Sequence, residues 1–330
     1  MRHITISNYG SFLGLSGERL VIREQDHIIR EVALSRLRSI SIAKKGISLS
    51  SDLVQACAYR GIRIFFLDWR ARNVSALIGM NQHAVVALRK QQFAFVQSPH
   101  LPRTVAELIS SKIINQRAVL LYFAKMLKSS VPQRSFTLRR TAEHLDVIIQ
   151  DLKNTLPENH WRARLLGAEG SAAKLYWDAL SHTQLFSASF SNRQGRGATE
   201  ITNQLLNYGY TILQSYVWSA LDNAGLEVYC GFYHTDRPGK PSLVLDTMEE
   251  YRAWVVDRNV IKLRHGLSKD DQLSPALKKR LTDEIHQTMA TIYPYRGKKL
   301  RLESILQRQV YRLCSTIVDQ KHYRGFHFKW

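Results

Sequence analysis

The sequence predicts an α+β protein, with a small β-rich N-terminal domain over residues 1–85 and a larger, mainly α-helical domain over residues 86–330. Up to about residue 80, short runs of β-branched residues alternate with glycine-containing turns, a pattern typical of strands. Beyond that point apolar residues recur at a period of roughly 3.6, which is typical of helices. The chain of 330 residues also exceeds the ~250–300 residues at which single hydrophobic cores stop growing, so two domains are expected.

The predicted N-terminal domain contains one helix among short strands. Ser50 or Ser51 can cap the start of this helix, and Gly61 follows its end. A basic turn over residues 69–73 is expected to connect the last two strands. In chain order the predicted elements are the strands His3–Ser7, Arg19–Arg23, Ile28–Val32 and Leu37–Ile42, the helix Ser51–Tyr59, and the strands Ile62–Asp68 and Val74–Ile78.

The predicted C-terminal domain consists of segments with helical periodicity, in which Gly and Pro are rare. A short apolar strand is expected at Ser242–Leu245, directly before a helix that opens with Asp246. The predicted helices are Gln82–Gln97, Val105–Lys128, Leu138–Leu156, His160–Ala179, Glu200–Ala224, Met248–Leu263, Pro275–Ile292 and Lys299–Val318.

The charge balance favours a polyanionic partner. The chain has 47 Lys and Arg against 27 Asp and Glu, a net charge of +20, and nucleic acid is the commonest polyanion. A solvated or membrane-facing basic surface is the alternative, but no apolar run reaches the ~18 residues of a spanning helix. Three scattered cysteines form no CxxC pair, which argues against a disulfide framework and a zinc site. Since the N-terminus also has no apolar signal core, we expect a cytoplasmic protein.

Glu169 is the first candidate for chemistry. It lies among glycine, alanine and serine residues and shares a helix face with Ala172, Ala173 and Tyr176. A carboxylate in such a small apolar stripe is costly to desolvate without a cationic partner. The helix alone leaves two partners open, an arginine in an interhelical salt bridge or a metal ion.

A second group of candidates lies between residues 230 and 258. His234 is expected where a strand meets a charged Gly/Pro loop, and a lone histidine is more often a surface residue than a ligand. Asp246 and Glu249 resemble an N-cap and the third residue of a capping box. Because they are three residues apart on one helix face, they can equally point at one cation. The sequence leaves both uses open.

Carboxylates and one imidazole are a donor set suited to phosphodiester chemistry. A divalent ion stabilises charge on phosphate oxygens, and two or three carboxylates with one histidine leave positions open for water and phosphate. Oxygen donors favour Mg²⁺, while a histidine makes Mn²⁺ equally plausible. The chain contains no P-loop, no GxGxxG after a strand, no GxSxG and no HExxH.

Three motifs in order carry a family resemblance. They are GAEGSAAKLYW around Glu169, TNQLLNYGYTIL at residues 202–213, and GFYHTDRPGKPSLVLDTMEEYRAWVVDR at residues 231–258. With them, the chain resembles the CRISPR-associated integrase family, the first of the Cas proteins. The resemblance implies that Glu169, His234 and Glu249 are ligands of Mg²⁺ or Mn²⁺ and that Asp246 lines the same site. There Asp246 would orient a metal-bound water, or the ring of His234 if that ring is not a ligand.

The resemblance also implies an activity and partners. Members are metal-dependent DNA endonucleases and integrases that join 3′-hydroxyl ends of prespacer DNA to a CRISPR repeat, so the expected partners are double-stranded and branched DNA. They form homodimers through the β-rich domain, use the helical domain for catalysis, and work with a small ferredoxin-like second Cas protein. The competing interpretation is a non-catalytic basic nucleic-acid-binding assembly subunit, in which the carboxylates only cap helices and pair with arginines.

Basic and aromatic side chains are the candidate DNA contacts. The loop at residues 187–199 is rich in Ser and Gly and is either a linker or a DNA-contacting loop. C-terminal aromatic residues either stack on unpaired bases or cover an apolar patch, with Tyr311 in the core. The predicted DNA-binding residues are Arg193, Arg196, Arg237, Lys240, Arg296, Lys298 and Lys299, and the aromatic residues are Tyr295, Tyr311, Tyr323, Phe326, Phe328 and Trp330.

Overall fold

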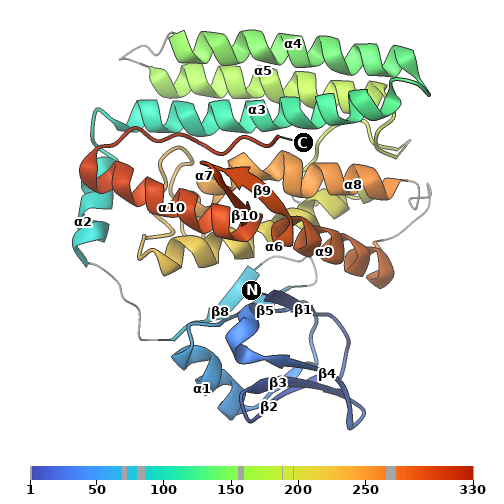
Figure 1. Ribbon diagram of the computed structural model, residues 1–330, viewed down its shortest axis with the longest axis vertical. Helices are drawn as coiled ribbons and strands as arrows, with labels where there is room; N and C mark the ends of the chain where they lie inside the picture. The colour runs from blue at the N-terminus through green and yellow to red at the C-terminus, as the bar shows by residue number, and fades with distance from the viewer. Residues whose placement is uncertain are drawn as a thin grey trace.

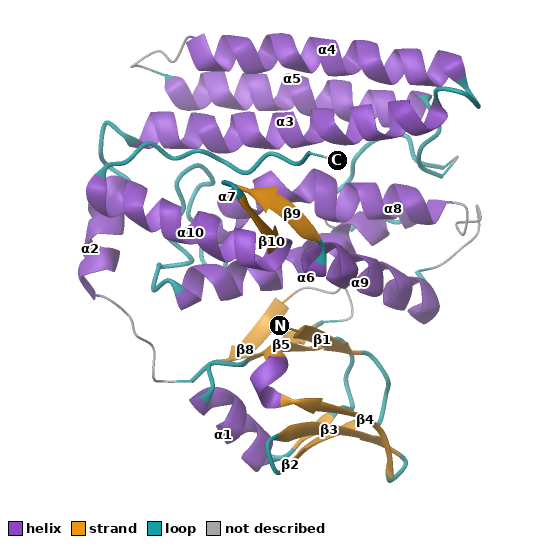
Figure 2. Cartoon of the chain, viewed as in Figure 1, coloured by secondary structure: helices purple, strands orange, loops and turns teal. Residues whose placement is uncertain are grey.

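The computed structural model describes residues 2–68, 73–79, 86–154, 160–187, 189–195, 197–264 and 273–329. A strand-rich N-terminal region precedes a mainly helical region, which confirms the predicted fold class (Figures 1 and 2). The regions have separate hydrophobic cores, one built from residues between Ile4 and Ile64 and the other from residues between Leu88 and Phe328. The predicted boundary at residues 85–86 adjoins residues 80–85, which lie outside the described residues, and it stays a prediction.

Two four-stranded sheets form the N-terminal region. Its elements are β1 (Arg2–Ile6), β2 (Phe12–Ser16), β3 (Arg19–Glu24), β4 (His27–Ala33), a 3-10 turn (Leu34–Arg36), β5 (Leu37–Ile42), β6 (Ser48–Leu49), α1 (Ser51–Tyr59), β7 (Arg63–Leu67) and β8 (Asn73–Leu77). The strand orders are β1-β5-β7-β8 and β4-β3-β2-β6. At the start of α1, Ser50 Oγ accepts a hydrogen bond from the N–H of Leu53 at 3.2 Å, so Ser50 is the cap.

Strands β2 and β6 are absent from the sequence prediction. Gly14 belongs to the glycine-containing stretch between the first two predicted strands, but it lies inside β2 and opposes Val21 of β3. Strand β6 has only two residues, and it forms because the tertiary fold brings it alongside β2. Of the predicted basic turn, residues 69–72 lie outside the described residues.

The helical region follows, and some of its helices are grouped in one layer (Figure 1). Its elements are α2 (Val86–Phe95), α3 (Leu101–Leu127), α4 (Pro132–Asn154), α5 (Trp161–His182), α6 (Ile201–Asn223), α7 (Ser242–Tyr251), a π-helical segment (Arg252–Asp257), α8 (Arg258–Leu263), α9 (Pro275–Ala290), β9 (Ile292–Tyr295), β10 (Lys298–Arg301) and α10 (Leu302–Asp319). Helices α3, α4 and α5 lie side by side at the end of the molecule far from the sheets, and α3 also packs on α7. No described helix is long and apolar enough to cross a membrane.

Two predicted elements in this region are wrong, and α4 begins at Pro132 rather than at the predicted Leu138. The strand expected at Ser242–Leu245 is the first turn of α7, because Leu243 and Val244 are buried one turn before Thr247 and Met248. Short apolar runs do not distinguish strand from helix by periodicity alone. The helix expected from Lys299 begins at Leu302, since β9 and β10 pair antiparallel around a two-residue turn. Arg296 and Gly297 both have positive φ there, as this type of hairpin turn requires.

The C-terminal segment, residues 320–329, packs along α3 (Figure 1). Asn115 of α3 donates to the carbonyl of Phe326 at 2.8 Å and accepts from the N–H of Phe328 at 3.0 Å. Tyr323, Phe326 and Phe328 of this segment are buried, as is Tyr295 of β9, so the segment covers apolar surface rather than offering aromatic rings to bases. Tyr311 is 51% exposed and is therefore not a core residue, and Trp330 lies outside the described residues.

Polar contacts join the N-terminal region to the helical region. Arg63 of β7 forms a buried ion pair with Asp222 of α6, and its Nε lies 2.7 Å from the carboxylate. The ring of His3 packs against Tyr216 with centroids 3.7 Å apart, and Tyr216 bonds to His286 Nδ1 at 2.6 Å. These contacts hold α6 against β7, β1 and α9, and Tyr210 of the same helix lines the cavity described below.

Candidate active site

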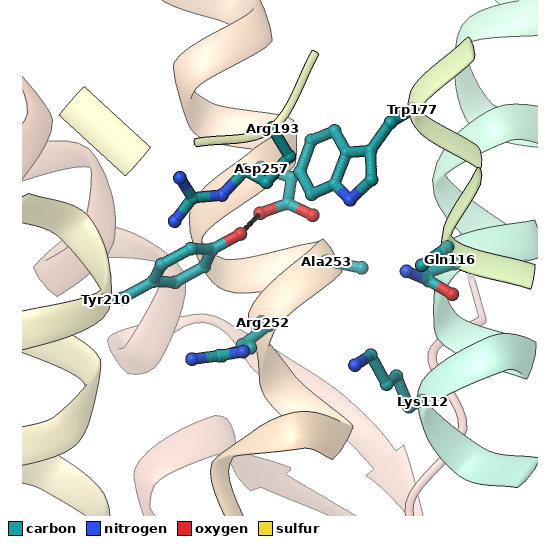
Figure 3. Close-up of a pocket in the computed structure, with 9 residues that line it drawn as sticks. Lys112, Gln116, Trp177, Arg193, Tyr210, Arg252, Ala253 and Asp257 are labelled. Carbon is teal, nitrogen blue, oxygen red and sulfur yellow. Dashed lines mark hydrogen bonds between the residues drawn. The ribbon is translucent and has the colours of Figure 1, made fainter. Parts of the chain in front are cut away.

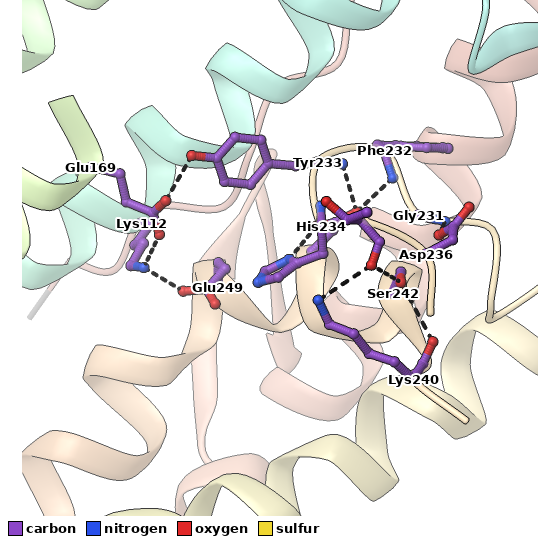
Figure 4. A network of polar contacts seen from close by, with 12 residues as sticks. Lys112, Glu169, Gly231, Phe232, Tyr233, His234, Asp236, Lys240, Ser242 and Glu249 are labelled. Atoms are coloured by element: carbon purple, nitrogen blue, oxygen red, sulfur yellow. Dashed lines mark hydrogen bonds and ion pairs between the residues drawn. The ribbon is translucent and has the colours of Figure 1, made fainter. Parts of the chain in front are cut away.

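Helices α3, α5 and α7 bring two predicted site carboxylates together around one lysine (Figure 4). Lys112 of α3 lies between Glu169 of α5 and Glu249 of α7. Its Nζ is 2.5 Å from Glu169 Oε1 and 2.8 Å from Glu249 Oε2. The interhelical salt bridge considered from the sequence therefore exists, but its cation is a lysine rather than an arginine. A single positive charge joins three helices at this point.

Glu249 is the most deeply buried member of the group. Its side chain is 2% exposed, and Arg252 on the next turn lies 2.7 Å from Oε1. Burial alone would raise the pKa of Glu249, but Arg252 and Lys112 lower it to about 2. Oε2 reaches Lys112 at ion-pair distance without the geometry of a hydrogen bond. Glu249 is thus a carboxylate with one oxygen held only by charge.

Glu169 is oriented from the opposite side by a tyrosine. The hydroxyl of Tyr233 donates to Glu169 Oε2 at 2.8 Å. Burial and the neighbouring Glu169 both raise the pKa of Tyr233, so the hydroxyl keeps its proton and remains a donor. Burial alone would lower the pKa of Lys112, but Glu249 and Glu169 raise it, so its ammonium stays charged.

Asp246 organises the loop that carries His234. Its side chain is fully buried and accepts hydrogen bonds from the N–H groups of Phe232 at 2.6 Å, Tyr233 at 3.0 Å and His234 at 3.0 Å. The same carboxylate also contacts the ring of His234, because Asp246 Oδ1 lies 2.6 Å from Nδ1. The predicted capping box is therefore wrong, because α7 begins four residues earlier and Asp246 caps the loop rather than the helix. Asp246 contacts the ring of His234, the role expected of it where that ring is not itself a ligand.

Gly231 explains why this loop follows α7 so closely. A side chain at this position would place its Cβ 2.4 Å from Ser242 Cβ and 2.9 Å from the carbonyl oxygen of His234. Only glycine allows that approach. With Nδ1 held by Asp246, the ring of His234 points toward Glu249 (Figure 4). No described residue forms a hydrogen bond with its Nε2.

These residues fit a divalent ion in the types of their donors. Two carboxylates from separate helices already share one cation, and an imidazole with a fixed Nδ1 hydrogen bond lies beside them. Histidine ligands of metals are commonly fixed by such a carboxylate. Within the described ranges, no three His, Cys, Asp or Glu side chains are grouped as a ready-made metal site. Lys112 occupies the space between two of the predicted ligands.

A cavity of about 90 Å³ adjoins Lys112 (Figure 3). Tyr210 lies under two guanidinium groups, those of Arg252 at 4.6 Å and Arg193 at 5.3 Å from the ring centroid. Asp257 accepts hydrogen bonds from Tyr210 and Tyr176, and burial raises its pKa to about 6 despite them. The cavity is lined by Lys112, Gln116, Ala173, Trp177, Arg193, Tyr210, Arg252, Ala253 and Asp257. Three cations and two aromatic rings therefore face one small space.

The predicted DNA-binding residues lie on three separate segments. Arg193 lines the cavity and donates to the side-chain oxygens of Asn203 at 3.1 Å and Asn207 at 2.6 Å. The loop after His234 carries the exposed Arg237 and the partly exposed Lys240. The β9–β10 hairpin carries the exposed Arg296, Lys298 and Lys299, whereas Arg196 lies outside the described residues. Their contact with DNA stays a prediction.

Lys112, Tyr233 and Arg252 are site residues that the sequence reasoning missed. Arg252 follows Glu249 by three residues, so helical spacing signals that pair. Lys112 is the lone charged residue between Glu107 and Arg117 in a long helix. Such a lysine is expected to be buried, and a buried lysine requires an acidic partner. Nothing in the sequence indicates that the partner is Glu169, 57 residues later.

Comparisons with known proteins place the chain in a family. The family model described as CRISPR associated protein Cas1 matches residues 4–293. The chain is 48% identical to the CRISPR-associated endonuclease Cas1 1 of Francisella tularensis subsp. novicida over 100% of both chains. It is 29% identical to the protein of that name from Archaeoglobus fulgidus over 99% of both.

Solved structures agree with this match. A casposase bound to integration product superposes with a TM-score of 0.80 at 19% identity, covering 100% of this chain and 95% of that one. A Cas1 protein from Thermotoga maritima gives 0.75 at 16% identity, covering 99% and 100%. At these identities the structures support the fold. Together with the family match and the 48% identity, they confirm the resemblance found in the three motifs: the chain belongs to the Cas1 family of CRISPR-associated proteins.

Proposed function

We propose that this protein is a metal-dependent DNA endonuclease and integrase of CRISPR adaptation, which joins prespacer 3′-hydroxyl ends to the CRISPR repeat by transesterification. Family membership and the relatives named endonucleases support the enzyme class. The casposase of the same fold is bound to an integration product, which supports strand joining as the reaction. The observation that carries the proposal is the pair Glu169 and Glu249, which hold a cation between two helices beside His234.

In this proposal Glu169, Glu249 and His234 Nε2 hold Mg²⁺ or Mn²⁺. Two oxygen donors and one nitrogen donor suit either ion. When bound, such an ion supplies Lewis-acid stabilisation of charge on the phosphate oxygens. Asp246 keeps the ring of His234 in place through Nδ1, and Tyr233 keeps Glu169 in place through Oε2.

The protein's own cations would position the target phosphate. Arg193 and Arg252 line the cavity next to the carboxylates, and guanidinium groups bind phosphate oxygens with two parallel hydrogen bonds. The incoming 3′-hydroxyl gives up its proton as its oxygen forms a bond to phosphorus, while the bond to the leaving 3′-oxygen breaks and that oxygen takes up a proton. The number of phosphodiester bonds is unchanged, so no energy source is consumed. Water in place of the hydroxyl would give cleavage.

The proposal includes partners and a location. Two solved structures with the same fold are Cas6-RT-Cas1–Cas2 complexes, with TM-scores of 0.78 and 0.67 at 20% identity. We propose that this chain likewise assembles with a small second Cas protein, forms a homodimer through its β-rich region, and works in the cytoplasm where its DNA is. The net charge of +20 supports binding of double-stranded and branched DNA.

Two alanine variants test this function. Glu169→Ala and His234→Ala are expected to abolish strand transfer and cleavage of branched DNA in Mg²⁺ or Mn²⁺, because each removes a proposed ligand. Their affinity for the same DNA, measured in EDTA, should stay near that of the unaltered protein. Unchanged joining activity in either variant would show that the altered residue is not a required metal ligand. Tight DNA binding by the unaltered protein without any metal-dependent product would favour the non-catalytic assembly subunit.

A further inference from the structure

Lys112 occupies the position that the proposed metal ion requires. Its ammonium lies within 2.8 Å of one oxygen of Glu169 and one of Glu249. A divalent ion binds such oxygens at about 2.0–2.2 Å, so it and the ammonium cannot both lie between these carboxylates. The side chain of Lys112 is only 13% exposed, so it is not a freely moving surface lysine. Metal binding therefore requires Lys112 to move.

The structure contains a second place for this ammonium. Gln116 lies one helical turn after Lys112, and both side chains line the same cavity (Figure 3). Gln116 is 4% exposed, and its Oε1 has no hydrogen-bond partner among the described residues. A buried acceptor without a donor is unfavourable, and an ammonium has three donors to offer. Asp257 lines the same cavity and adds negative charge to it.

The cavity also has room. Its volume of about 90 Å³ exceeds the ~30 Å³ that one water molecule occupies in the liquid, so an ammonium group fits without displacing a helix. A lysine side chain has four rotatable carbon–carbon bonds, which allow its end to move while the backbone of α3 stays in place.

We propose that Lys112 is a displaceable internal counter-ion: without metal it holds Glu169 and Glu249 together, and on metal binding its ammonium moves to Oε1 of Gln116. This inference rests on the proposed metal site. It assigns Lys112 a positioning role, because the lysine keeps two carboxylates from separate helices at the right spacing until an ion replaces it. The displaced charge joins Arg193 and Arg252 on the cavity wall, the side from which a DNA phosphate would approach.

A purely structural role for Lys112 predicts the opposite change in metal affinity when the lysine is removed. If Lys112 stayed in place and only tied α3 to α5 and α7, its removal would let the carboxylates separate, and metal binding would weaken. If Lys112 competes with the ion, its removal leaves two unpaired carboxylates, and metal binding becomes tighter. The sign of the change in metal affinity therefore separates the two roles.

The test measures Mn²⁺ affinity of the full-length protein from the electron paramagnetic resonance signal of free Mn²⁺. Lys112→Met keeps the aliphatic length and removes the charge, and it should bind Mn²⁺ about 5- to 150-fold more tightly, the usual range for coupled ligands. Gln116→Met should bind Mn²⁺ more weakly than the unaltered protein, because the displaced ammonium loses its acceptor. The matched control is Lys174→Met, an exposed lysine of α5, which should leave the affinity unchanged.

Each remaining outcome has a defined meaning. If the unaltered protein binds Mn²⁺ and Glu249→Gln does not, but Lys112→Met binds it equally or more weakly, the inference is wrong and the proposed function stands. If neither the unaltered protein nor Lys112→Met binds Mn²⁺, both are wrong. Equal affinity of Gln116→Met and the unaltered protein would rule out Gln116 as the receiving group. Should Lys112→Met fail to fold, Lys112→Gln gives the same comparison.

Discussion

Asp246 is the residue whose expected role changes most in the structure. A short acidic side chain can cap a helix, bind a metal or hold a loop, and its local sequence is compatible with all three. Its contacts settle on the third use, because it accepts hydrogen bonds from three successive N–H groups and faces His234 Nδ1. One residue thus fixes both the backbone of the loop and the ring that the loop carries.

Asp246→Asn is expected to reduce Mn²⁺ affinity and strand-transfer rate by about 10- to 100-fold, as is usual when a group that orients a metal ligand is lost. The amide nitrogen of asparagine would face N–H donors, so the loop would also be destabilised, by about 1–3 kcal/mol. Mn²⁺ titration and chemical denaturation measure the two effects. Asp236→Asn in the same loop is the control, since Asp236 is exposed and, among the described residues, accepts a hydrogen bond only from the N–H of Gly231. Equal Mn²⁺ affinity in Asp246→Asn and the unaltered protein would contradict the orienting role.

At this scale the sequence predicts residue identities better than their contacts. Glu169, His234 and Glu249 are proposed as site residues from the order of the three motifs, although each taken singly has an ordinary structural explanation. Lys112 cannot be found in that way, because a lone lysine in a long helix gives no sign of which carboxylates meet it. Long-range pairing depends on how α3, α5 and α7 pack, and that packing is a property of the whole fold.

Helix α7 shows how an element can be misassigned while its residues are correctly chosen. The run Ser242–Leu245 is apolar and short, so it suits a strand and a helix equally. In the fold this run is buried between α3 and α6 and forms a helical turn rather than a strand. The π-helical segment that follows adds one residue to a turn, and such segments are frequent at functional sites. Here the segment begins at Arg252, the partner of Glu249.

Glu250 holds the C-terminal segment to α7, and we expect burial of its carboxyl to make this stabilisation depend on pH. Tyr323 donates to Glu250 Oε1 at 2.5 Å and the N–H of Phe326 to Oε2 at 3.0 Å. Burial raises the pKa of Glu250 to about 7 despite these hydrogen bonds, against an ordinary value of 4.5. Because the folded state binds this proton more tightly, the contribution to stability is full below about pH 4.5. It is lost as the pH rises through 7.

Glu250→Gln should therefore gain stability relative to the unaltered protein as the pH rises. Glutamine stays neutral, so the difference in unfolding free energy should shift in its favour by on the order of 2–3 kcal/mol between pH 5 and pH 8. Urea denaturation of both proteins at several pH values measures this shift. Glu143→Gln, at an exposed position of α4, should show a constant difference over the same range. Parallel pH profiles for Glu250→Gln and the unaltered protein would show that Glu250 does not titrate in this window.

At the scale of the whole molecule, composition and periodicity are sufficient for the architecture. The change from short strands to long helices near residue 80 gives the fold class, and the separate cores around Ile40 and Val255 agree with it. The hairpin β9–β10 is missed because its signal is only the Arg296–Gly297 turn within a basic stretch. The contact of Arg63 with Asp222 is missed because 159 residues separate the two side chains.

We propose a single metal site formed by α5, α7 and the loop that carries His234, in which Lys112 occupies the position of the ion until metal binds. Diffraction from crystals of the protein soaked in Mn²⁺, with the anomalous signal of manganese, tests this most directly. We expect one ion bound by Glu169, His234 and Glu249, with the ammonium of Lys112 moved to Gln116. Manganese bound elsewhere, or absent while Lys112 still lies between the two carboxylates, would contradict it.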